Sequence, residues 1–216
     1  MNERVIFYVD GFNFYYGLKS QKRINKNWQL AYWIDVVKLF SQFVSPNQIL
    51  EKVIYFTASP LNQEKSNRQG AFLNANKLLN GNKFEVVRGK YLKKIVECPS
   101  CKFAISRPEE KKTDVNIAIR MIGDCLEDKA DIIVLVSGDS DLLPPIEFIQ
   151  RKYPQKKIRV YFPPTVFSVD LKNNIKDHNG KVVFLDNNFN KFANSVMPDV
   201  VSKNGKTYSI PEKWKV

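Results

Sequence analysis

The sequence predicts an α/β fold in which helices cover both faces of a mainly parallel sheet. Short apolar runs rich in β-branched residues alternate with longer segments of helical periodicity, which is typical of parallel strands joined by crossover helices. The clearest run, Ile132–Val136, has no polar residue, as expected of a strand buried on both faces. Two hairpin-like stretches depart from the alternation, and we expect them to decorate the sheet.

The other elements are expected in the same alternating order. Strands are predicted at residues 4–9, 53–57, 84–87, 158–162 and 181–185. Helices are predicted at residues 14–18, 31–44, 64–79, 113–126, 142–151 and 167–177. Asn80-Gly81 closes one of these helices, and Pro144 and Pro145 fit the first turn of another. Residues 21–27 are polar and basic, which favours a loop.

We expect one main domain with an insertion and an extension. A chain of 216 residues is of the usual size for one domain, here assigned to residues 1–190. Residues 90–107 predict a hairpin inserted between a strand and a helix, folded around a pair of cysteines. Residues 191–216 form an extension in which Asn204-Gly205 between two short apolar runs favours a type I′ hairpin.

The charge of the chain indicates a polyanionic partner. The formal net charge is +12, so nucleic acid is the first candidate and an acidic membrane surface the second. The alternative is a solvated basic surface that aids solubility. No apolar run is long enough to span a bilayer, and no cleavage-site pattern follows the N-terminus, so we expect a cytoplasmic protein without a membrane partner.

Acidic residues gather where two strands of the predicted sheet end. Asp10 follows the first strand, and Asp139 and Asp141 follow the central one. Ligands of open α/β sheets bind at this carboxyl edge, so Asp10 and Asp139 meet if the two strands are neighbours. Asp114 begins the helix that leads into the central strand, on a side of that helix that is otherwise apolar. It is therefore predicted to point inward.

Carboxylates that share a crevice repel one another unless a cation offsets their charge. Mg²⁺ and Mn²⁺ prefer oxygen ligands, and such a metal activates water and stabilises a phosphoryl group under attack. Each residue also has an ordinary structural explanation. Asp10 fits an Asx turn, Asn13 a helix N-cap, Asp114 a first-turn position favoured by the helix dipole, and Asp141 the cap of the next helix.

Three motifs together resemble a known family. They are Asp10-Gly11-Phe12-Asn13-Phe14, Glu110-Lys111-Lys112-Thr113-Asp114-Val115 and Ser137-Gly138-Asp139-Ser140-Asp141. In order and spacing they resemble the NYN-domain family, which includes the LabA-like proteins and belongs to the PIN-like nucleases. The resemblance runs from about Val5 to about Asp177. It departs at Leu142, where the family often has an aromatic residue.

The resemblance implies a PIN-like, Rossmann-like three-layer sandwich and a divalent-metal-dependent ribonuclease. Asp10, Asp114, Asp139 and Asp141 would bind Mg²⁺ or Mn²⁺ and carry the hydrolysis of RNA phosphodiester bonds. Asn13 would support Asp10 in catalysis. Ser137 would be a hydroxyl neighbour on the nucleic-acid-binding side.

The cysteine pair is half of a zinc ribbon. Zinc takes four ligands in tetrahedral sites, and Cys98 and Cys101 supply two. A Zn²⁺ site would need His178 and another ligand, or the same pair from a second subunit in a homodimer. The alternative is a reduced knuckle without metal. Cys125 lies in a helical apolar stripe and is assigned to the core.

Basic and aromatic residues could form a nucleic-acid groove beside the acidic residues. The basic candidates are Arg68, Arg88, Lys90, Lys111 and Lys112. Tyr15, Tyr16 and Tyr91 could stack on the bases of a single strand. Singly, each lysine is more typical of a solvated surface.

Two other function classes compete with the nuclease. One is a non-catalytic nucleic-acid-binding module with a vestigial acidic site. The other is a phosphohydrolase of small molecules, but Gly11 follows Asp10 without the Asp-x-Asp pair of haloacid-dehalogenase-type phosphatases, and there is no phosphate-binding Gly-rich loop.

Overall fold

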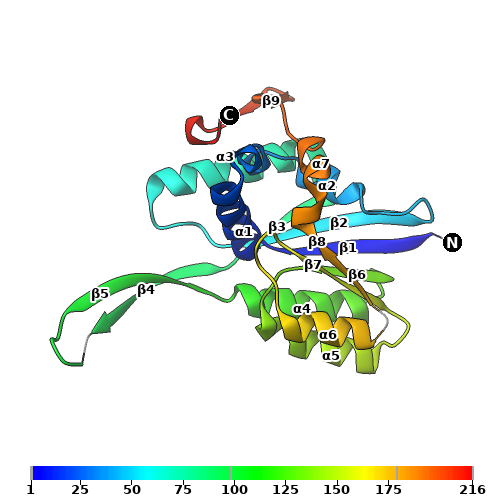
Figure 1. The fold of residues 1–216 in the computed structure, drawn as a ribbon. Helices are drawn as coiled ribbons and strands as arrows, with labels where there is room; N and C mark the ends of the chain where they lie inside the picture. Colours follow the sequence, from blue (N-terminus) through cyan, green and yellow to red (C-terminus); the bar gives the residue numbers. More distant parts are fainter. Residues whose placement is uncertain (1, 98, 179, 216) are drawn as a thin grey trace.

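The central sheet is parallel, as predicted. The structure is a computed structural model that describes residues 2–97, 99–178 and 180–215 (Figure 1). Within these residues six strands form one sheet in the order β3-β2-β1-β6-β7-β8, and every neighbouring pair is parallel. They are β1 (Glu3–Asp10), β2 (Gln48–Thr57), β3 (Phe84–Arg88), β6 (Ile132–Val136), β7 (Lys157–Phe162) and β8 (Lys181–Phe184). The order reverses between β1 and β6, which makes their carboxyl ends the topological switch point.

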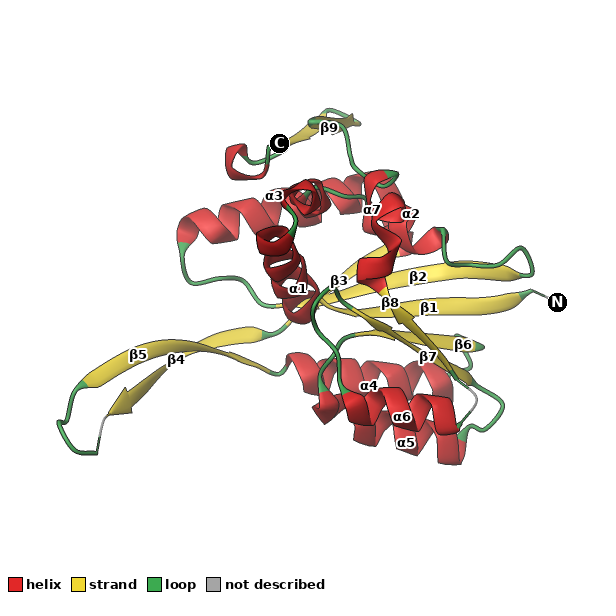
Figure 2. Ribbon diagram, viewed as in Figure 1, coloured by secondary structure: helices red, strands yellow, loops and turns green. Residues whose placement is uncertain are grey.

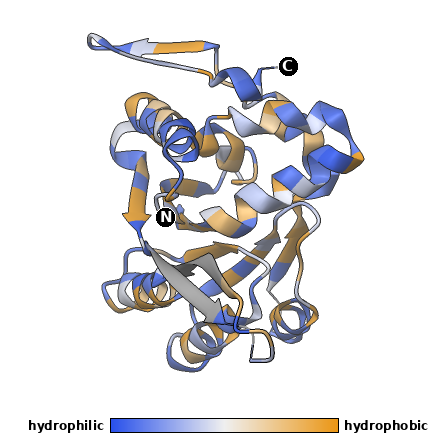
Figure 3. Ribbon diagram, turned by 90° about the vertical axis from the view of Figure 1, so that its left-hand side faces the viewer, coloured by the Kyte–Doolittle hydropathy of each residue, from blue (hydrophilic) through white to orange (hydrophobic). Residues whose placement is uncertain are grey.

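Helices cover both faces of this sheet (Figures 1 and 2). One layer holds α1 (Gly11–Ile24), α2 (Val36–Ser41), α3 (Gln63–Asn80) and α7 (Phe189–Ala193). The other holds α4 (Thr113–Leu126), α5 (Leu143–Lys152) and α6 (Val169–Asp177). Figure 3 shows hydrophilic and hydrophobic stretches mixed along these helices, as expected of helices with one face on a sheet.

Side chains that alternate along the strands divide the interior into two cores. In β1, Phe7 and Val9 belong to the core under α1–α3, whereas Ile6 and Tyr8 belong to the core under α4–α6. The first core is rich in aromatic rings, and Phe7 stacks on Phe40 with 4.6 Å between ring centroids. All five residues of β6 are buried, which confirms the prediction of a strand covered on both faces.

Two predicted helix boundaries were wrong. Residues 21–24, predicted as loop, continue α1 to Ile24, because their polar side chains lie on its solvent side while Phe14 and Leu18 are buried. The single helix predicted at 31–44 is divided. A 3₁₀ helix, η1 (Lys26–Tyr32), ends before Asp35. The Asp35 carboxylate then accepts the backbone N–H of Lys38 and begins α2.

The insertion is a long two-stranded ribbon that extends from the body (Figure 2). β4 (Lys90–Glu97) pairs antiparallel with β5 (Ala104–Lys111) along its whole length. The ribbon is longer than predicted, because residues 108–111 continue the backbone pairing with β4. At its turn Cys101 is exposed and free, and Cys98 lies outside the described residues.

The extension forms the predicted second hairpin. β9 (Val200–Lys203) pairs antiparallel with β10 (Lys206–Ser209). Asn204 and Gly205 both have positive φ, 51° and 73°, as a type I′ turn requires. The chain ends in a 3₁₀ turn, η5 (Glu212–Trp214), whose Trp214 is buried.

No helix in the described part of the chain is long and apolar enough to cross a membrane.

One helix, α4, exposes several apolar side chains. Val115, Ile119 and Leu126 of α4 are exposed, whereas Ile117 and Met121 are buried. The helix is therefore rotated so that Ile117 and Met121 face the sheet and Val115 and Ile119 do not.

Candidate metal centre and aromatic cavity

Asp10 is fixed at the end of β1 by four hydrogen bonds. Its Oδ1 accepts the backbone N–H groups of Phe12 (3.1 Å) and Asn13 (3.0 Å). Its Oδ2 accepts from Asn13 Nδ2 (2.6 Å) and Ser137 Oγ (2.8 Å). The side chain is buried, with 2% exposed. Asp10 is thus the N-cap of α1, and its carboxylate has one defined orientation.

Gly11 lets α1 begin directly against β2. A Cβ at this position would lie 2.6 Å from the carbonyl oxygen of Phe56 and 2.4 Å from the ring of Tyr55. Real Cβ atoms do not approach backbone so closely, so only glycine allows this contact. The close approach keeps Asp10 at the sheet edge instead of in a loop above it.

The end of β6 supplies the second wall. Val9 pairs with Val136, so Asp10 and Ser137 leave the sheet side by side. The Ser137 hydroxyl donates to Asp10 and accepts the backbone N–H of Asp139 (3.1 Å). Ser137 is fully buried, so its hydroxyl orients Asp10 and Asp139 from within the protein.

Asp139, and not Asp141, caps the turn that follows. Asp139 Oδ1 accepts the backbone N–H of Asp141 (3.0 Å) at the start of the 3₁₀ helix η3 (Ser140–Leu142). The alternative assignment of Asp141 as the cap of the next helix was wrong, because α5 begins after Leu142 without a side-chain cap. Asp141 instead lies exposed at the edge of the site.

Asp114 faces the same site from α4, but it is not inward-pointing. The side chain is exposed, because the buried stripe of α4 begins one residue earlier, at Thr113. The pKa of Asp114 is nevertheless raised to about 6, first by lost hydration and then by the charges of Asp10, Asp139 and Asp141. The four carboxylates, called the acidic cluster below, therefore share one electrostatic environment.

The chemistry of the acidic cluster fits a hard cation held partly through water. No group of three or more His, Cys, Asp or Glu side chains in residues 2–97, 99–178 and 180–215 is arranged to enclose a metal directly. Mg²⁺ keeps several waters and needs only one or two carboxylates. Oxygen donors whose mutual repulsion raises a pKa supply what such an ion requires. Asp10, whose oxygens already accept four hydrogen bonds, suits contact through water.

The described residues do not assemble a zinc site. Cys101 is exposed at the ribbon turn. His178 follows α6, whose end lies at the opposite edge of the sheet from the ribbon (Figure 1). Cys125 is buried, as predicted, and burial raises the pKa of its thiol to about 12.

The residues of the predicted basic groove lie on β3, on the ribbon, directly before α4 and on α3. Lys90 and Lys111 are paired across the base of the ribbon. Lys112 follows in a left-handed conformation, with φ 76°, directly before α4 and Asp114. Arg88, at the end of β3, donates to Ser59 Oγ (2.5 Å). Arg68 lies on α3.

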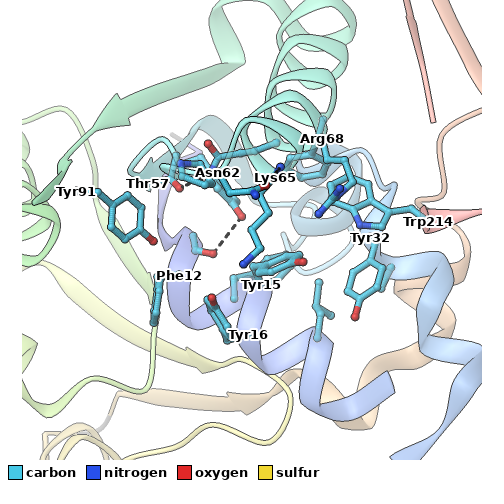
Figure 4. Close-up of a pocket in the computed structure, with 18 of the residues that line it drawn as sticks. Phe12, Tyr15, Tyr16, Tyr32, Thr57, Asn62, Lys65, Arg68, Tyr91 and Trp214 are labelled. Carbon is cyan, nitrogen blue, oxygen red and sulfur yellow. Dashed lines mark hydrogen bonds between the residues drawn. The ribbon is translucent and has the colours of Figure 1, made fainter. Parts of the chain in front are cut away.

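A cavity of about 360 Å³ adjoins the acidic cluster. It lies between α1, η1 and α3, and Figure 4 shows Phe12, Tyr16 and Tyr91 at one end and Tyr32 and Trp214 at the other. Sequence reasoning proposed Tyr15, Tyr16 and Tyr91 as stacking residues but did not predict a cavity. No local signal in the sequence places Trp214 against Tyr32 of η1 and Phe72 of α3; only the tertiary fold does.

One known protein family matches most of the chain. The family model of the NYN domain matches residues 4–178. The chain belongs to the NYN domain family. This confirms the resemblance of the three motifs, and the NYN domain carries with it a PIN-like nuclease fold.

Two similar proteins differ in what is known of them. The chain is 25% identical over 193 residues to 6-hydroxy-3-succinoylpyridine 3-monooxygenase HspA of Pseudomonas putida, a match that covers 74% of this chain and 59% of the relative. A crystal structure of a protein of unknown function from Vibrio parahaemolyticus matches with a TM-score of 0.54 and 22% identity. The match covers 86% of this chain and 94% of the other, and it shows only that the two proteins have a similar fold.

Proposed function

We propose that this NYN protein is a divalent-metal-dependent ribonuclease that hydrolyses phosphodiester bonds at the acidic cluster. The observation that carries the proposal is that Ser137 joins Asp10 and Asp139 at the switch point between β1 and β6, where Asp114 and Asp141 also lie. A chain of net charge +12 that concentrates negative charge at one point is suited to bind a polyanion around a cation.

Each residue of the acidic cluster has a distinct role in this proposal. Asp139, Asp114 and Asp141 are the exposed or half-exposed carboxylates that would hold Mg²⁺ or Mn²⁺. Asp10 would orient a water bound to the metal, since Asn13 Nδ2 and Ser137 Oγ both donate to its Oδ2 and hold the carboxylate in place. When bound, the metal supplies an activated water and offsets charge on the phosphoryl group.

The basic residues at the base of the ribbon would bind the RNA backbone. Lys90, Lys111 and Lys112 lie directly before the helix that carries Asp114. Arg88 adds a further charge at the neighbouring end of β3. Contacts of this kind position the polyanion and are independent of its sequence.

The test is cleavage of a labelled single-stranded RNA with Mn²⁺, with Mg²⁺ and with EDTA. We expect cleavage that needs the metal and is lost in Asp139→Asn. Asp177→Asn, an exposed aspartate at the far end of α6, is the matched control and should cleave as the wild type does. Equal trace activity in all three proteins would refute the enzyme, and RNA binding unaffected by EDTA would then favour a non-catalytic binding module.

The name of the Pseudomonas relative suggests a second candidate, oxidation of an aromatic acid. The cavity favours it, because aromatic rings and the cations Lys65 and Arg68 line one space. The same chain incubated with 6-hydroxy-3-succinoylpyridine, O₂ and NADH would show a hydroxylated product by mass spectrometry. Unchanged substrate would remove this candidate.

A further inference from the structure

The aromatic cavity, defined above as the space between α1, η1 and α3, begins where the acidic cluster ends. Gly11 and Phe12 line it, and the Phe12 N–H donates to Asp10 Oδ1. On the other side, Tyr91 lines it and lies two residues after Gly89, where a Cβ would come within 2.6 Å of the hydroxyl of Thr113, the neighbour of Asp114. Asp10 and Asp114 therefore both lie near one end of the cavity. This end, lined by Phe12, Tyr16 and Tyr91, is called the mouth below.

The rings at the mouth are open to solvent. Phe12 and Tyr16 are 40% and 42% exposed, and their ring centroids lie 4.4 Å apart. Lys19 Nζ lies 5.4 Å from the centre of the Tyr16 ring. Exposed rings beside a cation are the usual platform for bases of a single strand. Tyr32 and Trp214, at the inner end, are buried.

Two cations of α3 also line the cavity. Lys65 and Arg68 are three residues apart, so they share a face of the helix. Figure 4 shows the Lys65 side chain reaching across the cavity toward Tyr15 and Tyr16. Arg68 Nη1 is 3.6 Å from a carboxylate oxygen of Glu64, which is an exposed partner. These cations suit the phosphate of a nucleotide whose base enters between the rings.

We propose that the aromatic cavity takes one base of a single-stranded RNA while a neighbouring phosphodiester lies over the acidic cluster. The inference rests on the proposed ribonuclease function and specifies its substrate as unpaired RNA. Its volume of about 360 Å³ is within the range of about 300–1,000 Å³ for ligand pockets. A small aromatic acid would fill the buried end, but it would leave the open rings Phe12 and Tyr16 without a role. A strand that continues outside uses both.

The test measures binding separately from cleavage. In EDTA, the affinity of the protein is measured for a labelled RNA of five nucleotides. It is compared with the affinity for the same RNA carrying one abasic position and with the affinity for a duplex of the same sequence. We expect the unmodified single strand to bind most tightly and to change the tryptophan fluorescence of the protein, since Trp214 lines the cavity. Tyr16→Ala should weaken binding about tenfold, since stacking on an aromatic ring is worth roughly 1–3 kcal/mol per base.

The controls separate this inference from the proposed function. Ile24→Ala changes an exposed apolar residue on the same helix α1 and should bind as the wild type does. Tyr16→Phe keeps the ring and should restore the affinity. Asp139→Asn should lose cleavage and keep both binding and the fluorescence change.

Three results would be decisive. Metal-dependent cleavage that is indifferent to Tyr16→Ala and to the abasic position would overturn the base site and leave the nuclease standing. Binding that depends on Tyr16 without any cleavage would support the base site and refute the nuclease. A fluorescence change with 6-hydroxy-3-succinoylpyridine and none with RNA would overturn the base site in favour of a small aromatic acid.

Discussion

At the scale of single residues, Asp10 shows how one side chain serves both fold and site. As an N-cap it satisfies two backbone N–H groups that α1 would otherwise leave without partners. Its second oxygen ties α1 to β6 through Ser137. Because the same carboxylate belongs to the acidic cluster, the geometry of the site is set by the packing of β1 against β6.

The hydroxyl of Ser137 can be removed without removing any charge. Ser137→Ala deletes one of the four hydrogen bonds to buried Asp10 and the acceptor for the Asp139 N–H. We expect a loss of about 1–3 kcal/mol in the free energy of unfolding, measured by urea denaturation, and slower RNA cleavage. Ser202→Ala, at an exposed serine of β9, should change neither. A variant as stable as the wild type would show that Asp10 is held without Ser137.

The ionised side chain of Asp114 destabilises the folded protein, and a substitution can remove its charge. Its pKa is about 6 in the folded state against the ordinary 3.8, so ionisation costs stability as the pH rises from about 4 to 6, and the cost remains above pH 6. Asp114→Asn should therefore raise the melting temperature in EDTA at pH 7.5. The gain should be no more than about 1 kcal/mol, since solvent screens an exposed charge.

Thermal melts across pH 3–8 check this expectation. At pH 3 Asp114 is largely protonated in both states, so the variant and the wild type should melt together. Asp177→Asn is the matched exposed control. A variant that is less stable than the wild type at pH 7.5 would show that the Asp114 charge is already offset by the protein itself.

At the scale of elements, a network of charges fixes α4 to the sheet edge. Arg120 of α4 donates to Glu85 of β3 (2.6 Å) and to Asp124 (2.8 Å). Lys52 of β2 donates to the same Glu85 (2.9 Å). Tyr8 of β1 donates its hydroxyl to buried Asp124 (3.0 Å). The network joins three strands to the helix that presents Asp114.

Acid should weaken this network at Glu85. The hydrogen bond from Arg120 lowers the pKa of Glu85 to about 2, against an ordinary value of 4.5. Its stabilisation is complete above pH 4.5 and is lost as the pH falls toward 2, an effect of roughly 2 kcal/mol. Glu85→Gln should be less stable at pH 7 and should lose less stability on acidification. Urea denaturation at pH 7 and pH 3 measures both, with Glu51→Gln, an exposed residue of β2, as the control. Equal pH dependence in wild type and variant would contradict the argument.

Elements were predictable where local chemistry decides them. Five apolar residues in succession are enough to identify β6, and Asn204-Gly205 is enough to identify the last hairpin. The end of α1 was missed because polar residues suit the solvent side of a helix as well as a loop. The rotation of α4 was missed because apolar residues lie on more than one side of this helix, and only packing decides that Ile117 is buried and Ile119 exposed.

The site, too, could be predicted where neighbouring strands decide it and not where helix boundaries or tertiary packing decide it. Asp10 and Asp139 could be placed together because parallel strands that are neighbours end at one edge. The cap at Asp139 and the exposure of Asp114 depend on the exact start of a turn and of a helix, which boundaries read from sequence do not resolve. The cavity needs Trp214 from the far end of the chain, a contact without any periodic signal.

At the scale of the whole molecule, the positive charge surrounds a negative centre. The net charge of +12 draws RNA to the protein from any direction, but only residues near the cleavage point should hold phosphates in the bound state. Affinity alone does not separate these effects, because every lysine contributes to the long-range field. The dependence of affinity on salt separates them, since it counts the phosphates that are contacted directly.

The salt dependence of binding therefore tests where the strand lies. With the Asp139→Asn protein in EDTA, the logarithm of affinity for single-stranded RNA should fall linearly with the logarithm of salt concentration. Lys65→Ala, in the cavity wall, should reduce the slope by about 0.7, the value for one phosphate contact on a single strand. Lys152→Ala, at the end of α5 on the opposite sheet edge, removes the same charge from the whole protein and should leave the slope unchanged. Equal slopes in both variants would mean that RNA does not pass along α3, and the path from the acidic cluster into the aromatic cavity would be wrong.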